Sequence, residues 1–221
     1  MFIGMLLAYS VVFALIASVV CHTEWKKYYI WVKVLNSLAF LIVFFTSTYI
    51  SGEIIQFWLM LPAFFCCFVG DILMAAYNRY RKRIQFLMGL GIFLAGHLCF
   101  VRWLAAMQAI SVIDLLIPVL AVLLTWYLVS RKDVHTGKLK PFILIYAFFV
   151  AMFFVKGQHL AIISPSLSNI MIAVGSMLFL ISDISILFLY FRKRKGPFIH
   201  LFNLATYYYA MFLLATQLLF L

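Results

Sequence analysis

Eight long apolar segments occupy almost the whole of this 221-residue chain and constrain its fold more than any other feature. Most of them are about 19 to 23 residues long, and a helix of that length crosses roughly 30 Å of hydrocarbon. The composition agrees, since 67% of the residues are hydrophobic and only 10% are charged, which is too apolar for a soluble core of this size. The sequence therefore predicts an all-α, polytopic membrane protein with a single transmembrane domain over residues 1–221.

Short turns separate the expected helices. Pro141 and Pro197 fall in the first turns of two of them, where proline is tolerated. The eight transmembrane helices are expected at residues 2–20, 28–50, 54–76, 85–107, 110–130, 141–160, 169–191 and 198–220. Since no soluble domain is expected, any chemistry must take place within the helix bundle or at its rim.

The net charge of +11 is concentrated in alternate loops. Fourteen of the 17 Lys and Arg residues lie at 26–27, 79–83, 131–140 and 192–195. This positive-inside pattern predicts that the basic loops face the cytoplasm and that both termini lie on the other side. The basic residues therefore indicate contact with anionic lipid headgroups and no nucleic-acid partner. The expected location is the inner membrane of a bacterium or the endoplasmic reticulum of a eukaryote.

Two short motifs suggest an internal pseudo-repeat. Asp71 ends the motif VGD and Asp183 ends the motif ISD, 112 residues further on, which is about half of the chain. Each is followed nine or ten residues later by a basic loop. The halves would each hold four helices and would therefore have parallel orientation, as in some transporters.

Charged residues inside the spans need an explanation, because a charge near the bilayer centre costs about 2.5 to 3.5 kcal/mol. Arg102, Asp114 and Lys156 lie toward the outer ends of their helices, where side chains can reach the interface. Lys33, Asp71 and Asp183 differ. Each lies about five to nine residues from a cytoplasmic helix end, at a comparable depth of roughly 8 to 13 Å.

Other polar side chains reach the same zone, so the sequence predicts a polar cavity toward the cytoplasmic leaflet. They are His97, Ser182, Asn203, Tyr207 and Tyr208. Two carboxylates in such a cavity would differ in protonation, because burial favours the neutral form and a nearby ammonium favours the ionised form. Asp71 and Asp183 are therefore candidates for an acid and base pair.

Structural alternatives remain open at this point. Lys33 could form a buried salt bridge with one aspartate while the other accepts hydrogen bonds from Ser or Tyr. His97 lies near Gly89, Gly91 and Gly96, small residues that allow close helix packing, and could be a packing residue. A metal site of Asp71, His97 and Asp183 lacks a paired ligand spacing, so no metal or cofactor is expected.

Four motifs in order resemble the YhhN-like lysoplasmalogenase family. They are VGD, GIFLAGHLCF, VGSMLFLISD and TYYYAMFLLATQ, and VKVL around Lys33 resembles the lysine region of that family's second helix. The resemblance runs from the second helix to the C-terminus. Three positions depart from it: Phe100 replaces a usual tyrosine, Met211 replaces a usual glutamine, and a proline after the lysine is missing.

The resemblance implies hydrolysis of the vinyl ether bond of lysoplasmalogen to a fatty aldehyde and a glycerophospho-alcohol. Asp71 and Asp183 would be the catalytic pair. The substrate-binding residues would be Lys33, His97, Ser182, Asn203, Tyr207 and Tyr208. The partners would then be a lysophospholipid substrate and the surrounding membrane lipids.

Two other functions fit the same residues. Intramembrane carboxylates also serve proton relays, so a lysolipid transporter or binding protein is one alternative. A metal-dependent membrane hydrolase of the ceramidase kind is the other.

Overall fold

The computed structural model of the protein describes residues 1–131, 139–191 and 197–221, and the regular elements of this part are all helical. This confirms the predicted all-α class. The α-helices are α1 (Phe2–Cys21), α2 (Tyr29–Ser51), α3 (Ile54–Tyr80), α4 (Arg83–Met107), α5 (Ile113–Val129), α6 (Lys140–Ile163), α7 (Leu167–Phe191) and α8 (Pro197–Thr216). Among the described residues, seven helices are long and apolar enough to cross a membrane, whereas α5 is shorter.

Several helix ends differ from the expected ones. The prediction ended α3 where its apolar run stops, but the helix continues to Tyr80. Its last turn is closed by Arg81, whose φ of 56° lies in the left-handed region. Two short 3₁₀ helices were not predicted, Thr23–Tyr28 before α2 and Gln217–Phe220 after α8. Hydropathy alone cannot place these ends, because backbone hydrogen bonds continue into the polar flanks.

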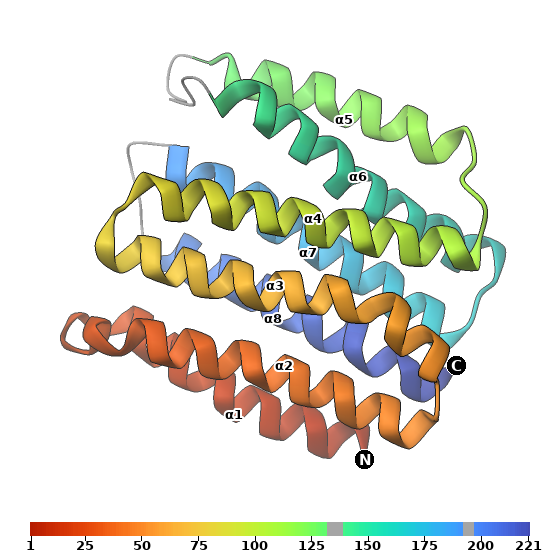
Figure 1. The fold of residues 1–221 in the computed structure, drawn as a ribbon, viewed down its shortest axis with the longest axis horizontal. Coiled ribbons are helices and arrows are strands. Elements are labelled where there is room, and N and C mark those ends of the chain that lie inside the picture. The colour runs from red at the N-terminus through yellow and green to blue at the C-terminus, as the bar shows by residue number, and fades with distance from the viewer. Residues whose placement is uncertain (132–138, 192–196) are drawn as a thin grey trace.

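The helices run side by side in a bundle (Figure 1). Helix α3 packs against α4 and α7 packs against α8, while α6 contacts α4 and α7. Helix α2 joins α3 to α8, α1 covers α2 and α8, and α5 packs on α6. We call the end with residues 22–28 and 81–82 the basic end, and the end with both termini the terminal end (Figure 1). Which end faces the cytoplasm stays a prediction, as does the pseudo-repeat.

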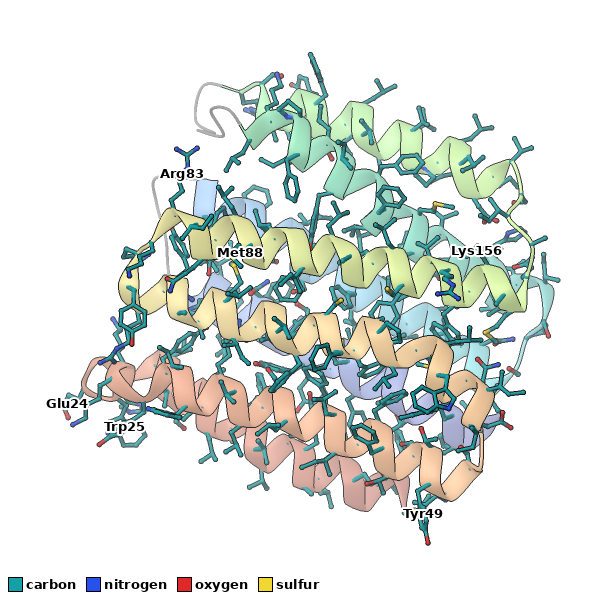
Figure 2. All side chains as sticks on the ribbon, in the orientation of Figure 1. Glu24, Trp25, Tyr49, Arg83, Met88 and Lys156 are labelled. Carbon is teal, nitrogen blue, oxygen red and sulfur yellow. The ribbon has the colours of Figure 1, made fainter. Side chains whose placement is uncertain are left out.

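The outer surface of the bundle is apolar, as contact with lipid requires. Val11 of α1, Ile42 of α2 and Leu123 of α5 are each more than 60% exposed. Trp25 at the basic end and Tyr49 at the terminal end project outward (Figure 2). Aromatic rings at both ends are typical of the two membrane interfaces. Together with the spans, this surface makes the chain an integral membrane protein.

A buried charge cluster near the terminal end corrects one expectation. Asp114 of α5 and Lys156 of α6 do not lie at the surface, since both are 0% exposed and form an ion pair of 3.1 Å; Lys156 lies near the terminal end (Figure 2). Asp114 also lies 3.0 Å from His159. These charges are compensated by each other inside the bundle, where pairing is the alternative to reaching water. Arg102, in contrast, is exposed as expected.

Candidate active site

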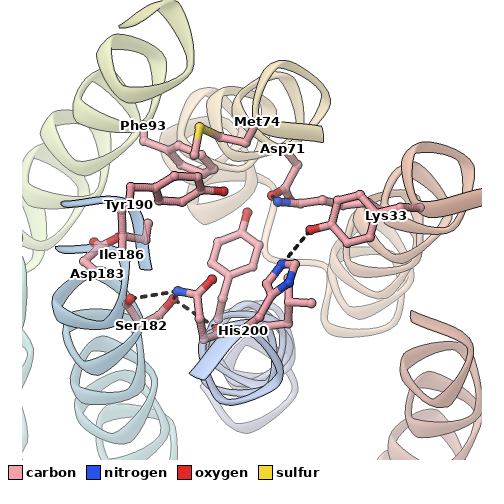
Figure 3. A pocket seen from close by; sticks show the side chains of 13 residues that line it. Lys33, Asp71, Met74, Phe93, Ser182, Asp183, Ile186, Tyr190 and His200 are labelled. Carbon is pink, nitrogen blue, oxygen red and sulfur yellow. Dashed lines mark hydrogen bonds and ion pairs between the residues drawn. The ribbon is translucent and has the colours of Figure 1, made fainter. Parts of the chain in front are cut away.

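A polar cavity lies among α2, α3, α4, α7 and α8, near the basic end (Figure 3). It holds about 20 Å³, and a water molecule needs roughly 10 to 15 Å³. The cavity thus has room for a water molecule beside both aspartates. Its lining consists of Tyr29, Lys33, Asp71, Met74, Phe93, Ser182, Asp183, Ile186, Tyr190, His200, Asn203, Leu204 and Tyr207.

Both carboxylate oxygens of Asp71 have a polar partner. Lys33 Nζ lies 3.0 Å from Oδ1, and Ser37 Oγ donates a hydrogen bond of 2.7 Å to Oδ2. Lys33 and Ser37 are four residues apart on α2 and so share one helix face. The carboxylate is only 1% exposed. Asp71 therefore has both a cation and a hydroxyl donor as partners inside the bundle.

Close packing of α3 and α4 fixes the position of Asp71. At the preceding residue, Gly70, a β-carbon would lie 2.9 Å from the ring of Phe93. Only glycine allows that ring to approach α3 so closely. Phe93 then forms an apolar wall of the cavity next to Asp71 (Figure 3).

Asp183 is placed differently, against a histidine rather than a lysine. Nδ1 of His97 faces the backbone carbonyl of Phe93 at 2.9 Å, and because a carbonyl only accepts, Nδ1 must carry a proton. Nε2 of His97 lies 3.1 Å from Asp183 Oδ2. On the other oxygen, Tyr146 of α6 donates a hydrogen bond of 3.2 Å to Oδ1.

Nε2 of His97 and Oδ2 of Asp183 are both buried, and neither has an aligned hydrogen-bond partner among the described residues. A proton between them would relieve the contact of a ring nitrogen with a carboxylate oxygen, because a buried polar group without a partner is unfavourable. The pair is therefore a candidate to hold a proton at the cavity.

Ser182 and Asn203 line the cavity but direct their hydrogen bonds to each other. Asn203 Nδ2 donates to the backbone oxygen of Ser182 at 2.8 Å and lies 2.9 Å from its Oγ. Ser182 Oγ in turn lies 3.2 Å from the backbone oxygen of Asn203. These contacts join α7 to α8, so both residues form the wall of the site.

The two adjacent tyrosines of α8 have different surroundings. Tyr208 does not line the cavity; its hydroxyl lies 3.3 Å from both Ser37 Oγ and the backbone oxygen of Lys33. It therefore supports the helix turn that positions Lys33. Tyr207 lines the cavity, and its buried hydroxyl has no hydrogen-bond partner among the residues that the structure describes. A buried polar group of this kind calls for an explanation, and a bound water or substrate supplies one.

Some residues of the site were missed in the sequence. Ser37 carried a signal, since it lies one helical turn after Lys33. No sequence signal indicated Tyr146. None indicated the hydrogen bond of 3.0 Å between Tyr29 and His200, which closes the cavity toward the basic end (Figure 3). These contacts depend on how separate helices are rotated against each other. Among the described residues no group of three or more His, Cys, Asp and Glu side chains is placed to hold a metal ion.

The fold and the cavity together define an all-helical membrane protein with two acidic residues in unlike environments around one buried site. The chain belongs to the YhhN family, whose model matches residues 28–218. This confirms the family resemblance drawn from the motifs. Neither a curated protein nor a solved structure matched the chain.

Proposed function

We propose that the protein is a lysoplasmalogenase, which hydrolyses the vinyl ether bond of a 1-alkenyl-glycerophospholipid with a single chain. The observation that carries the proposal is the pair of unlike acids around one cavity. Asp71 is paired with Lys33, whereas Asp183 faces His97 at 3.1 Å. Membership of the YhhN family, which the motifs liken to lysoplasmalogenases, supports the same reaction.

Vinyl ether hydrolysis begins when the alkene carbon that is not bonded to oxygen takes a proton. The His97–Asp183 pair would supply it, leaving Asp183 as a carboxylate beside the neutral imidazole. The carbon bonded to oxygen then becomes an oxocarbenium ion, which the new negative charge stabilises. This combination of acid and anion is the one that glycoside hydrolysis also requires.

Water then adds to the cation while Asp71 accepts a proton from it. The product is a hemiacetal, with Asp71 protonated and Asp183 ionised. When the hemiacetal collapses to the aldehyde, Asp183 takes its hydroxyl proton and Asp71 protonates the leaving glycerol oxygen. Both groups return to their starting states, so no external proton is consumed. Lys33 and Ser37 favour the return of Asp71 to its ionised form.

The neighbouring residues have supporting roles in this proposal. The hydroxyl of Tyr207, which lies near Asp71, would orient the water or the ether oxygen. His97 is assigned to the acid and not to the headgroup, because its ring faces Asp183. Lys33 is assigned to Asp71 and not to the headgroup, because its ammonium lies beside that carboxylate. At about 20 Å³ the cavity matches a water molecule, so the reacting end of the lipid enters only when lining side chains move.

The direct test measures aldehyde release by the purified full chain in detergent or vesicles. Three single-chain lipids with the same headgroup and chain length are compared: the 1-alkenyl, the saturated 1-alkyl and the 1-acyl form. Only the alkenyl lipid is expected to release aldehyde, because only its double bond can be protonated to an oxocarbenium ion. Release of fatty acid from the acyl lipid alone would overturn the proposal, and lipid movement across vesicles without cleavage would favour a transporter.

A further inference from the structure

An apolar groove lies on the other side of the helix pair that walls the cavity. It holds about 390 Å³, which falls in the range of small-molecule sites. Ile181, Ile184, Ser185 and Phe188 of α7 form one side, and Phe198, Ile199 and Phe202 of α8 form the other. The cavity is lined instead by Ser182, Asp183 and Ile186 of α7 and by His200, Asn203, Leu204 and Tyr207 of α8.

The two sets alternate along the same helix turns and lie on different faces of the two helices. At 3.6 residues per turn, Ile184 of the groove projects about 160° away from both Ser182 and Ile186. On α8, Phe202 and Asn203 are neighbours in sequence and project about 100° apart. The groove and the cavity therefore lie at the same depth, separated by the contact between Ser182 and Asn203.

The chemistry of the groove suits hydrocarbon. Among the residues that the structure describes, its lining contains no charged side chain, and its one polar side chain, Ser185, donates its hydroxyl to the backbone oxygen of Ile181 at 2.9 Å. Phe198 is 78% exposed and Ile184 47% exposed, so the groove opens to the surface that faces lipid.

We infer that this groove is the site for the hydrocarbon chain of the single-chain lipid, and that the ether end reaches the cavity between α7 and α8. The inference rests on the proposed function for the identity of the lipid. The ether end would then lie level with Asp183, and it would reach the cavity past the Ser182–Asn203 contact.

The first test fills or widens the groove. Ile184→Trp is expected to raise KM at least tenfold for a long-chain alkenyl lysolipid and less for a short-chain one, with kcat within about twofold. Phe202→Ala, which widens the groove, is expected to shift the preference toward longer chains. Ile42→Trp places the same ring on the lipid-facing side of α2, away from the groove, and should leave both constants unchanged. Equal effects of Ile184→Trp and Ile42→Trp would overturn the inference.

The second test does not depend on turnover. A saturated 1-alkyl lysolipid with a photoreactive diazirine in its chain is bound to the full protein and to Asp71→Asn, and the labelled peptides are mapped. Label is expected on residues 181–188 and 198–202, and excess unlabelled alkyl lysolipid should remove it while a two-chain phospholipid should not. Label spread evenly over the lipid-facing helices would overturn the inference.

The two readouts separate this inference from the proposed function. Competed labelling without aldehyde release would keep the groove as a lysolipid site and reject the reaction. Aldehyde release without competed labelling would keep the reaction and reject the groove.

Discussion

Two buried Asp–Lys pairs of nearly equal length lie at opposite ends of this bundle. Lys33 and Asp71 are 3.0 Å apart near the basic end, and Lys156 and Asp114 are 3.1 Å apart near the terminal end. By residue type, burial and distance they are almost the same. Their surroundings differ, and this difference separates a candidate catalytic group from a structural one.

The Lys156–Asp114 pair is fully satisfied. Lys156 Nζ also donates to the backbone oxygen of Ala109 at 2.8 Å and lies 3.4 Å from Gln108 Oε1, so its three protons have acceptors. Asp114 accepts from the backbone N–H of Ser111 at 2.8 Å and lies 3.0 Å from His159. The cluster therefore fastens the start of α5 to α6, and α5 has its main packing contacts with that helix.

The Lys33–Asp71 pair, in contrast, faces a cavity. The same cavity holds Asp183 and the unpartnered hydroxyl of Tyr207. A buried ion pair is weak evidence for function by itself, because helices use such pairs to compensate charge. Space beside the pair and unsatisfied neighbours are the features that indicate chemistry.

The largest expected effect comes from neutralising the acids of the cavity. Asp71→Asn and Asp183→Asn should each lower kcat by about 10²- to 10⁴-fold, because each removes one proton-transfer step. Asp114→Asn removes the same charge from the structural pair and should leave kcat of the folded protein within about twofold. Aldehyde release is measured per amount of monodisperse protein. A comparable loss in all three variants would erase the distinction between the two pairs.

For stability, the Lys156–Asp114 pair is expected to matter more than the pair at the cavity. Lys156→Met removes the ammonium from Asp114 but leaves Ser111 N–H and His159 beside it, so it should cost less than the roughly 3 to 5 kcal/mol of a fully unpaired buried charge and should lower the thermal unfolding midpoint in detergent. The double variant Lys156→Met with Asp114→Asn should regain part of the loss, because no unpaired charge remains. Unfolding is followed by tryptophan fluorescence. If the double variant is no more stable than Lys156→Met alone, the ion pair does not explain the loss.

The sequence was enough to predict the helices and the depth of the polar residues. Position along a transmembrane helix translates directly into depth, at about 1.5 Å per residue. For that reason Lys33, Asp71 and Asp183 could be expected at one level, and the structure places all three at one cavity. The assignment of their roles stays a prediction for the kinetic tests.

The partners of these residues could not be predicted, because they depend on how each helix is rotated about its axis. Rotation decides that Lys33 faces Asp71, whereas His97 faces Asp183. Rotation also turns the side chain of Lys156 into the bundle. Its position near a helix end had suggested only that the side chain reaches the interface. Packing sets this rotation through many small contacts, such as that of Phe93 against Gly70, and a single sequence does not reveal them.

The smallest effects are expected from the neighbouring tyrosines Tyr207 and Tyr208. Within one helix turn they again compare a residue that lines the cavity with one that has a structural role. Tyr208→Phe removes a hydroxyl that contacts Ser37 and the backbone of Lys33, and should cost about 0.5 to 1.5 kcal/mol of stability. Tyr207→Phe removes a buried hydroxyl that lies near Asp71 without an aligned hydrogen bond among the described residues. Its stability should therefore be unchanged or slightly higher.

The effect on kcat should be larger for Tyr207→Phe than for Tyr208→Phe. Tyr207→Phe is expected to lower kcat about tenfold if its hydroxyl orients the water or the ether oxygen, while Tyr208→Phe should lower kcat less than threefold. The two variants have the same change of composition, so differences in expression or detergent binding cancel in the comparison. An unfolding midpoint lowered by Tyr207→Phe, with kcat unchanged, would make that hydroxyl a structural group and remove it from the proposed mechanism.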